Sequence, residues 1–362
     1  MPVDHSSPLS LLPETFDVAV HHLNLTAATP FRVLLGSIRQ GKKVVAADTY
    51  ATAMAFYSWL RKFAQVKIPV TDYATSQRNK AFFASLTDGF LLRITHGRAM
   101  LRSAPQNPWL AELFPEKDDF LLKFSDFLGI NGSWQWFRNG ILFPGLDYPL
   151  HPYYGVYFPT RFGHLQLFDQ WLKSQKPFSQ ALDMGAGCGV LSFYLLKNGC
   201  QKVTATDINP FALKSIRMEL KNHPEASKIG LHAGSFFDGL QPKKFDLVVF
   251  NPPWTPGSIA NSLDLATHYG QGFFDQFFEQ ASRLLSGHTL LVIPFSNFGL
   301  VAGITKNHPI ANEIENNRFE VVEHRKQAIQ QAPSKRRNWL AELRQNEMDE
   351  LWVLQKSKSN IE

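Results

Sequence analysis

Three short segments combine residue types that can bind a small ligand and hold a reacting group. The first, Asp183-Met184-Gly185-Ala186-Gly187-Cys188-Gly189, has glycines at alternate positions, where the missing Cβ lets a backbone turn sharply and approach a ligand. The amides that open the next helix favour a carboxylate or phosphate. Val190 stands where a dinucleotide loop, G-x-G-x-x-G, needs a small residue, so that cofactor class fits poorly. Asp183 suits a ligand that carries an amino group.

A carboxylate and a second turn follow this loop. Asp207 closes the apolar run VTATD at 203–207, where its oxygens can accept hydrogen bonds from both hydroxyls of a ribose. Taken alone, Asp207 is explained equally well as the cap of a helix that begins near Asn209-Pro210. The turn GSFFDG at 234–239 places Ser235 and Phe236 where they could border a planar base. A turn with a core pair of phenylalanines is an equally good interpretation.

The third segment, Asn251-Pro252-Pro253-Trp254, follows the apolar run FDLVVF at 245–250. Its two prolines lack an amide hydrogen and restrict the backbone, so we expect a stiff, extended corner at a strand end. There the Asn251 side-chain carbonyl and the Pro252 backbone carbonyl can accept two N–H bonds and orient a nitrogen lone pair. Trp254 can stack on a planar group and tolerate a passing positive charge.

The elements that must position these segments alternate along the middle of the chain. Apolar runs that begin at Gln180, Val203, Phe245 and His288 are separated by segments of helical periodicity, which predicts a parallel, doubly wound sheet. The runs at 319–325 and 349–356 predict two further strands, with a polar, basic insertion near 326–348 between them. In such a sheet, ligands bind at the carboxyl ends of the strands, where all three segments lie.

The first 150 residues show a different pattern of apolar residues. Helical periodicity over 27–40, 48–65, 78–102 and 108–128 predicts a mostly helical N-terminal domain, residues 1–150, with a role in substrate recognition. The aromatic, Gly- and Pro-rich stretch 134–159 is expected to be extended. Residues 151–362 then form the catalytic domain, which carries the insertion near 326–348.

With these segments in place, the sequence resembles the class I S-adenosylmethionine-dependent methyltransferases, within the "methyltransferase small" group that carries N-P-P-aromatic. The resemblance covers roughly 150–300 and implies a Rossmann-like, seven-stranded, mostly parallel sheet. It also implies S-adenosyl-L-methionine as cofactor. Members of this group act on glutamine amides of release factors and on exocyclic amines of RNA bases. The resemblance therefore implies methyl transfer to an amino or amide nitrogen of a planar acceptor.

The resemblance also assigns roles by position. The catalytic motif is Asn251, Pro252, Pro253 and Trp254, although members more often end it with Tyr or Phe. Ser235 stands where members usually have Asp against the adenine. The implied cofactor-binding residues are Asp183, Gly185, Gly187, Gly189, Asp207, Ile208, Ser235, Phe236 and Asn251, joined by Tyr157, Pro159, Thr160 and Arg161 of the stretch GVYFPTR at 155–161.

The composition excludes several classes of protein. The chain has 362 residues, 44% hydrophobic and 19% charged, which excludes a disordered protein. Two cysteines, without metal-ligand spacing, predict no disulfide framework, no metal site and a reducing, cytoplasmic setting. No apolar stretch is long enough to predict a membrane span. The net charge of +6 comes wholly from residues 1–150 and 325–362.

The acceptor stays open between RNA, protein and a small metabolite. Weak RNA contact through the basic flanks, Arg32, Arg39, Lys42 and Lys43 on one side and Lys335-Arg336-Arg337 on the other, is one interpretation. A solvated charged surface is the alternative. Transfer to a small metabolite at N or O, or a non-catalytic protein that keeps the cofactor fold, are the remaining functional hypotheses.

Overall fold

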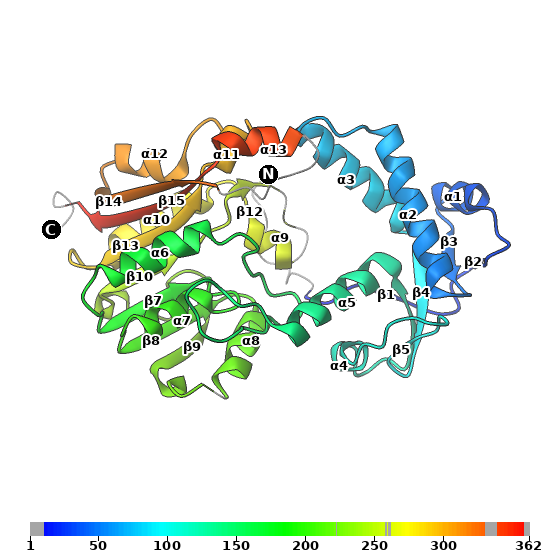
Figure 1. Cartoon of the computed structure of the whole chain (residues 1–362), viewed down its shortest axis with the longest axis horizontal. Helices are drawn as coiled ribbons and strands as arrows, with labels where there is room; N and C mark the ends of the chain where they lie inside the picture. The colour runs from blue at the N-terminus through cyan, green and yellow to red at the C-terminus, as the bar shows by residue number, and fades with distance from the viewer. Residues whose placement is uncertain (1–10, 222, 258, 260–261, 330–338, 358–362) are drawn as a thin grey trace. The chain divides into compact units, whose positions relative to one another are not determined.

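The computed structural model describes residues 11–329 and 339–357 except 222, 258 and 260–261 (Figure 1). The chain divides into two compact units. Of the described residues, one unit contains those from 136 to 329 and from 341 to 357, and the other contains 11–135 together with 339–340. Each unit has its own sheet and its own core. The sequence prediction placed the boundary after residue 150, whereas the units meet between Gln135 and Trp136, inside helix α5 (Phe124–Asn139).

The larger unit is built on a seven-stranded sheet in the order β14-β15-β13-β10-β7-β8-β9. Strand β15 is antiparallel to both of its neighbours, β13 and β14, and the pairings from β13 through β9 are parallel. The strands are β7 (Gln180–Met184), β8 (Lys202–Asp207), β9 (Ile229–Ala233), β10 (Leu247–Phe250), β13 (Leu290–Ser296), β14 (Phe319–Ala328) and β15 (Met348–Lys356). The predicted Rossmann-like, mostly parallel seven-stranded sheet is confirmed.

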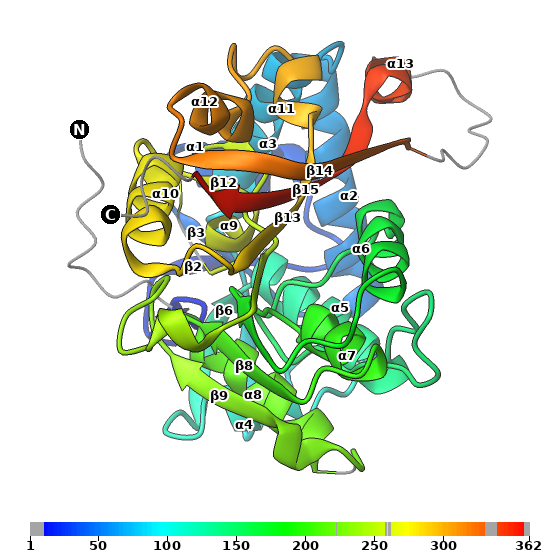
Figure 2. The same ribbon diagram turned by 90° about the vertical axis from the view of Figure 1, so that its left-hand side faces the viewer.

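Helices cover both faces of this sheet, as a doubly wound fold requires. Figure 2 shows α10 (Phe273–Leu284) and α12 (Pro309–Glu315) on one side, and α6 (Gly163–Lys173) and α7 (Val190–Lys197) on the other. Helix α8 (Pro210–Leu220) connects β8 to β9. All four residues of the central strand β10 are buried, because a parallel strand with helices on both faces meets no solvent.

The remaining elements of this unit are short. They are η1 (Ala226–Lys228), η2 (Pro242–Lys244), β11 (Thr255–Pro256), α9 (Ser262–Thr267), β12 (His268–Tyr269), α11 (Phe298–Val301), α13 (Trp339–Leu343) and η3 (Arg344–Asn346). In the expected insertion near 326–348, β14 extends to Ala328 and α13 begins at Trp339. Residues 330–338, which include the basic run 335–337, lie outside the described residues.

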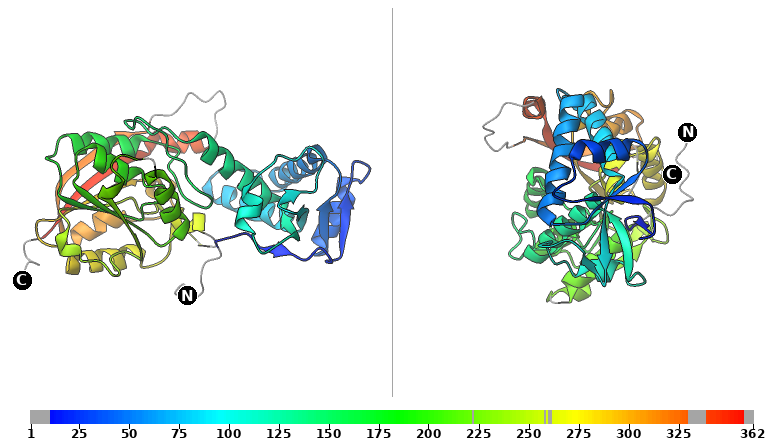
Figure 3. Two further views of the ribbon diagram at one scale, coloured as in Figure 1. Left: turned by 90° about the horizontal axis from the view of Figure 1, so that it is seen from below. Right: turned by 90° about the vertical axis from the view of Figure 1, so that its right-hand side faces the viewer.

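The smaller unit has a sheet that the sequence prediction did not include. Five of its strands have the order β1-β6-β4-β3-β2, and β5 pairs with β4. Helices supply more of its residues than strands do (Figure 3). The buried Val45, Leu91 and Leu121 of three neighbouring strands form a core cluster. The strands are β1 (Thr15–Phe16), β2 (His22–Leu25), β3 (Lys43–Ala46), β4 (Phe90–Thr95), β5 (Arg98–Ala99) and β6 (Asp119–Lys123). The other helices are α1 (Phe31–Arg39), α2 (Tyr50–Lys67), α3 (Tyr73–Thr87) and α4 (Trp109–Leu113).

Three of the expected segments in this region were wrong in part. The helix over 78–102 ends at Thr87, and Phe90–Thr95 forms the buried strand β4 instead. The helix over 108–128 is interrupted by strand β6, and the start of the expected extended stretch, 134–139, belongs to α5. Buried strands and buried helix segments are equally apolar, so short runs such as FLLRIT do not separate the two by periodicity.

No helix among the described residues is long and apolar enough to cross a bilayer. Cys188 and Cys200 are both buried free thiols.

Candidate active site

The glycine loop leaves the carboxyl end of β7 in a conformation that only glycine adopts readily. Gly185, Gly187 and Gly189 have φ values of 60°, 53° and 82°. A Cβ on Gly187 would lie 3.0 Å from the backbone oxygen of Tyr157, and one on Gly189 would lie 2.9 Å from Ile216. The predicted loop therefore packs directly against the segments that contain Tyr157 and Ile216. Side chains in place of Gly187 and Gly189 would force those segments to move.

Asp183 precedes this loop and is fully buried. Its Oδ2 accepts hydrogen bonds from the backbone N–H of Ser192 at 2.8 Å and from the Ser192 hydroxyl at 2.6 Å. Its Oδ1 has no hydrogen-bond partner within the described part of the chain. Burial raises the pKa of Asp183 to about 7. The residue thus supplies a buried acceptor with unused capacity at the base of the loop.

Asp207 ends the neighbouring strand β8 and ties the loop to the next helix. Its Oδ2 accepts from the backbone N–H of Gly187 at 2.8 Å, and its Oδ1 from that of Asn209 at 2.8 Å. Burial raises the pKa of Asp207. The side chain of Asn209, rather than Asp207, caps α8 by accepting from Phe211 N–H at 3.0 Å. A backbone hydrogen bond from Ile208, whose side chain is exposed, also reaches the carboxylate, which leaves room for one further donor.

The segment 155–161 lies over this loop, as expected. The backbone oxygen of Gly155 accepts from the Asn209 amide at 2.9 Å, and the Tyr157 carbonyl faces Gly187. Burial raises the pKa of the Tyr157 hydroxyl to about 12. Pro159 is buried and Thr160 is exposed. The residues of this segment predicted to bind the cofactor are Tyr157, Pro159, Thr160 and Arg161, and of these Tyr157 lies against the glycine loop.

The N-P-P-W segment leaves the carboxyl end of β10, next to the glycine loop on β7. The register pairs Phe250 with Met184, so Asn251 and Gly185 follow neighbouring strand ends. The Trp254 indole N–H donates a hydrogen bond to Asn251 Oδ1 at 3.1 Å. Pro252 and Pro253 are buried. The structure thus brings the predicted cofactor loop and the predicted acceptor motif to one edge of the sheet.

A charged side chain and a ring that were not predicted to belong to the acceptor motif contact Trp254. The Arg161 guanidinium lies 5.9 Å from the centre of the Trp254 ring, and the buried His164 ring meets it edge-on at 4.8 Å. Arg161 donates from Nη1 to the fully buried Glu347 at 2.8 Å, which also accepts from the Ser296 hydroxyl at 2.9 Å. Arg161 therefore contacts the acceptor motif and Glu347, although it was assigned to the cofactor.

Burial sets the protonation of these groups. Desolvation, together with Arg161, lowers the pKa of His164 to about 3, so this imidazole is neutral. Burial raises the pKa of Asp349, beside Gly163, to about 6. Glu347 and Asp349 lie in the insertion and the last strand, nearly 200 residues from Arg161. No local spacing signals their approach, since it depends on β15 returning beside β13.

The turn 234–239 contributes an aromatic side chain rather than an acidic one. Phe236 adopts a left-handed φ of 48°, and its ring lies 5.3 Å from Phe273 and 6.2 Å from Phe250. It is half-buried and packs against the core cluster of α10 and β10. Ser235 accepts a hydrogen bond from Asp238 N–H through its backbone oxygen. Both interpretations of this turn, base contact and core packing, remain compatible with this placement.

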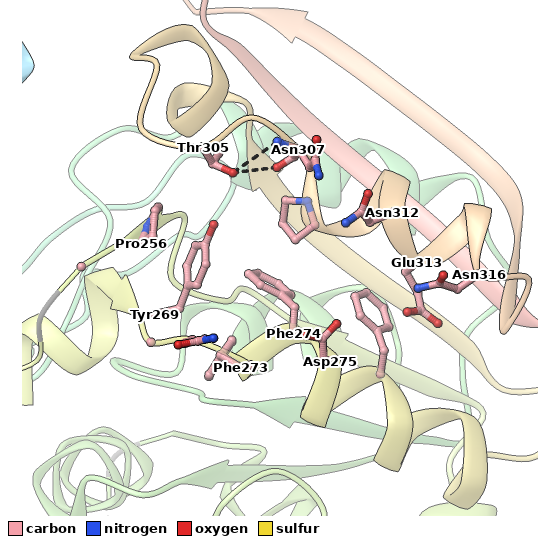
Figure 4. A pocket seen from close by; sticks show the side chains of 16 residues that line it. Pro256, Tyr269, Phe273, Phe274, Asp275, Thr305, Asn307, Asn312, Glu313 and Asn316 are labelled. Atoms are coloured by element: carbon pink, nitrogen blue, oxygen red, sulfur yellow. Dashed lines mark hydrogen bonds between the residues drawn. The ribbon is translucent and has the colours of Figure 1, made fainter. Parts of the chain in front are cut away.

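A separate cavity of about 400 Å³ lies between the amino-terminal ends of α10 and α12 (Figure 4). Tyr269, Phe273 and Phe274 form one wall, and Asn307 and Asn312 face them. It contains none of the residues assigned above to the cofactor or to the N-P-P-W segment. The site is therefore defined by the strand ends, not by this cavity.

Comparison with known proteins shows that the larger unit is similar to methyltransferases. Residues 165–321 match the family model of the methyltransferase small domain. A putative protein N5-glutamine methyltransferase of Methanocaldococcus jannaschii is 27% identical over 179 residues, which cover 47% of this chain and 87% of that protein. A tRNA1(Val) (adenine(37)-N6)-methyltransferase of Actinobacillus pleuropneumoniae is 28% identical over 123 residues, which cover 32% of this chain and about half, 52%, of that protein.

Among solved structures, a ribosomal protein L11 methylase from Lactobacillus delbrueckii subsp. bulgaricus is similar with a TM-score of 0.36 and 17% identity. That similarity covers 59% of this chain and 91% of the other. The family match spans the glycine loop, Asp207 and the N-P-P-W segment. The smaller unit lies outside it.

Proposed function

We propose that this chain, a methyltransferase with a methyltransferase small domain at residues 165–321, methylates a nitrogen atom. The nitrogen belongs to an amino or amide group of a planar acceptor. The acceptor is an RNA base or a protein glutamine, and S-adenosyl-L-methionine is the methyl donor. The observation that carries the proposal is the Asn251 carboxamide, held at a strand end beside the glycine loop by the Trp254 indole.

The residues present fit the proposed cofactor. The unpartnered Oδ1 of the buried Asp183 can accept an N–H bond from the donor's amino group. The glycine loop offers backbone without Cβ atoms, and the Asp207 carboxylate beside that loop can accept from a ribose hydroxyl. Ile208, Ser235 and Phe236 would border the base. When bound, the cofactor supplies a sulfonium-activated methyl group.

The chain's own residues prepare the acceptor nitrogen. An amide or aniline-like nitrogen is a poor nucleophile, because its lone pair is delocalised. Asn251 Oδ1 uses one lone pair for the Trp254 N–H and keeps the other for an acceptor N–H. The Pro252 carbonyl would accept the second N–H, so that the nitrogen lone pair is directed at the methyl group. Neutral His164 and the paired Arg161 support Trp254, and neither is required as a base.

The relatives favour nitrogen as the accepting atom. One is named for N5 of glutamine and another for N6 of adenine, and both acceptors are planar groups whose nitrogen carries two N–H bonds. Transfer to a small metabolite, at N or O, is the second candidate. The smaller unit, outside the family match, is proposed to recognise the acceptor. The two buried free thiols fit a reducing, cytoplasmic setting.

Transfer of a labelled methyl group tests this proposal. The full chain is incubated with labelled S-adenosylmethionine and lysate, which is then separated into RNA, protein and small molecules. We expect label in RNA or protein, and none with Asn251→Ala. Label confined to small molecules would favour the second candidate, and binding of NAD in place of S-adenosylmethionine by calorimetry would overturn the proposal.

A further inference from the structure

The positive charge of this protein is concentrated in one stretch of the smaller unit. Residues 31–88, which include α1, α2 and α3, contain nine Lys and Arg and three Asp. Their surplus of six equals the net charge of the whole chain, +6. The rest of the chain is therefore neutral in sum, and this stretch is the electrostatically distinct part of the molecule.

Eight of these nine basic side chains are exposed and form no ion pair with a carboxylate among the described residues. They are Arg32, Arg39, Lys42, Arg61, Lys62, Lys67, Arg78 and Lys80. The exception is Lys43, which lies 4.0 Å from Asp88. We call the eight side chains the cationic surface. Because none of the eight is held in such a pair, their charge is available to an anionic partner.

Aromatic rings lie among these cations. The Arg39 guanidinium is 5.1 Å from the centre of the Phe63 ring, and Lys67 is 5.8 Å from the same ring. Further along α2, Arg61 is 5.3 Å from Tyr57 and 5.4 Å from Phe83 of α3. A ring holds a cation in place without neutralising it. The surface thus offers positioned charges next to half-buried rings.

We propose that the cationic surface on α1, α2 and α3 binds the sugar–phosphate backbone of RNA. A phosphate chain can contact several exposed cations at once, and rings beside the cations suit exposed bases. A membrane surface fits less well, because helices that lie on bilayers turn large apolar side chains outward. Here Trp59 and Phe63 stack on each other at 5.7 Å, and the exposed large apolar side chains of these helices are single valines, Val33 and Val66.

This inference rests on the proposed function and deepens it, because it selects RNA rather than protein as the acceptor class. The smaller unit is outside the methyltransferase small domain, so the surface is an addition to the catalytic unit. Binding through phosphates carries little sequence information. The surface would therefore supply affinity and register, and the strand-end site would select the nitrogen.

The test compares two triple variants of the full chain with equal charge loss. Lys62→Gln/Lys67→Gln/Lys80→Gln removes three cations from the surface, and Lys176→Gln/Lys197→Gln/Lys202→Gln removes three exposed lysines of the larger unit. All six positions are solvent-exposed, so we expect both variants to fold, which circular dichroism checks. The probe is a fluorescent, mixed-sequence, single-stranded RNA of about 20 nucleotides, titrated by anisotropy over a series of salt concentrations.

We expect the surface variant to bind RNA at least about tenfold more weakly at low salt. Its slope of log affinity against log salt should fall by about 2, since each lost phosphate contact on a single strand removes about 0.7. The control variant should bind like the wild type. Equal loss in both variants would show only unspecific charge attraction and overturn the inference. Equal binding to phosphatidylserine vesicles, also lost in the surface variant, would assign the surface to lipid instead.

Failure of this inference is distinguishable from failure of the proposed function. Asn251→Ala should abolish methyl transfer and leave RNA affinity unchanged, whereas the surface variant should keep S-adenosylmethionine binding by calorimetry. Methyl transfer to protein without RNA binding would refute the RNA-binding surface and support the methyltransferase activity. RNA binding without any methyl transfer would support the surface and refute the proposed activity.

Discussion

The indole N–H of Trp254 donates a hydrogen bond to Oδ1 of Asn251 at 3.1 Å. This bond connects the side chains at the first and last positions of the N-P-P-W segment. The buried prolines between them fix the backbone, and the hydrogen bond fixes the carboxamide. A preorganised acceptor costs little to orient when the substrate arrives. A Tyr or Phe at position 254 has no indole N–H to make this bond.

Asn251→Ala should lower kcat by about 100-fold to 1000-fold, or ~2.7–4 kcal/mol, because one preorganised acceptor is lost. Affinity for S-adenosylmethionine, measured by calorimetry, should be unchanged. The matched control is Asn312→Ala, an exposed asparagine in the cavity between α10 and α12. Equal activity of Asn251→Ala and the control would contradict the assigned role.

Trp254→Phe keeps an aromatic ring and removes the donor to Asn251. Loss of one hydrogen bond, about 0.5–1.5 kcal/mol, should lower kcat by a factor of about 2 to 10. Trp254→Ala also removes the ring that Arg161 and His164 contact, so its loss should be clearly larger. Initial rates at saturating donor separate the two variants. A Phe variant as impaired as the Ala variant would mean that the N–H, not the ring, matters.

The Arg161–Glu347 ion pair should stabilise the folded protein, because it compensates the charge of a buried carboxylate. Glu347 is fully buried, and Arg161→Gln leaves only Arg344, at 3.4 Å, to pair with it. The substitution should therefore lower the free energy of unfolding by less than the ~3 kcal/mol that a fully unpaired buried charge costs. Glu347→Gln in the same chain should recover part of the loss in a double-mutant cycle, measured by urea unfolding. Lys228→Gln, which breaks the exposed pair with Glu225, serves as control and should cost less than about 1 kcal/mol.

Asp183 should make stability depend on pH. Burial raises its pKa from 3.8 to about 7, so the folded chain binds the proton more tightly than the unfolded chain. The contribution of Asp183 to the free energy of unfolding is therefore largest at low pH and is lost as pH rises toward 7. Asp183→Asn, which can still accept from Ser192, should flatten the dependence of the melting temperature on pH between about pH 4 and 7.

The exposed Asp238→Asn is the control for that experiment and should keep the wild-type pH profile. Parallel profiles for wild type and Asp183→Asn would show that Asp183 does not titrate in this range.

Two glycine-to-alanine substitutions should have opposite effects. Gly187 has a φ of 53°, and a Cβ there would meet the Tyr157 oxygen at 3.0 Å, so Gly187→Ala should lower both the melting temperature and cofactor affinity. Gly129 lies inside α5 with nothing within 4 Å of a Cβ. Gly129→Ala should therefore stabilise the protein by about 0.5–1 kcal/mol. Thermal melts with and without S-adenosylmethionine check both, and a neutral Gly187→Ala would contradict the closed loop.

The sequence by itself determined the catalytic sheet and its motifs. The glycine loop, Asp207 and the N-P-P-W segment each follow an apolar run, and carboxyl ends of adjacent parallel strands meet at one edge. Strand β9 and the sheet of the smaller unit were not predicted. Their apolar residues suit a buried helix equally well, and only pairing with distant strands separates the two.

The tertiary structure alone decided which side chains surround Trp254. Arg161 lies in the stretch assigned to the cofactor, yet it pairs with Glu347 because β15 returns beside β13 and carries that carboxylate to the site. It also decided that the basic residues of α1, α2 and α3 stay unneutralised. Sequence spacing lists charges in order along the chain, whereas burial and pairing depend on contacts between segments that only folding brings together.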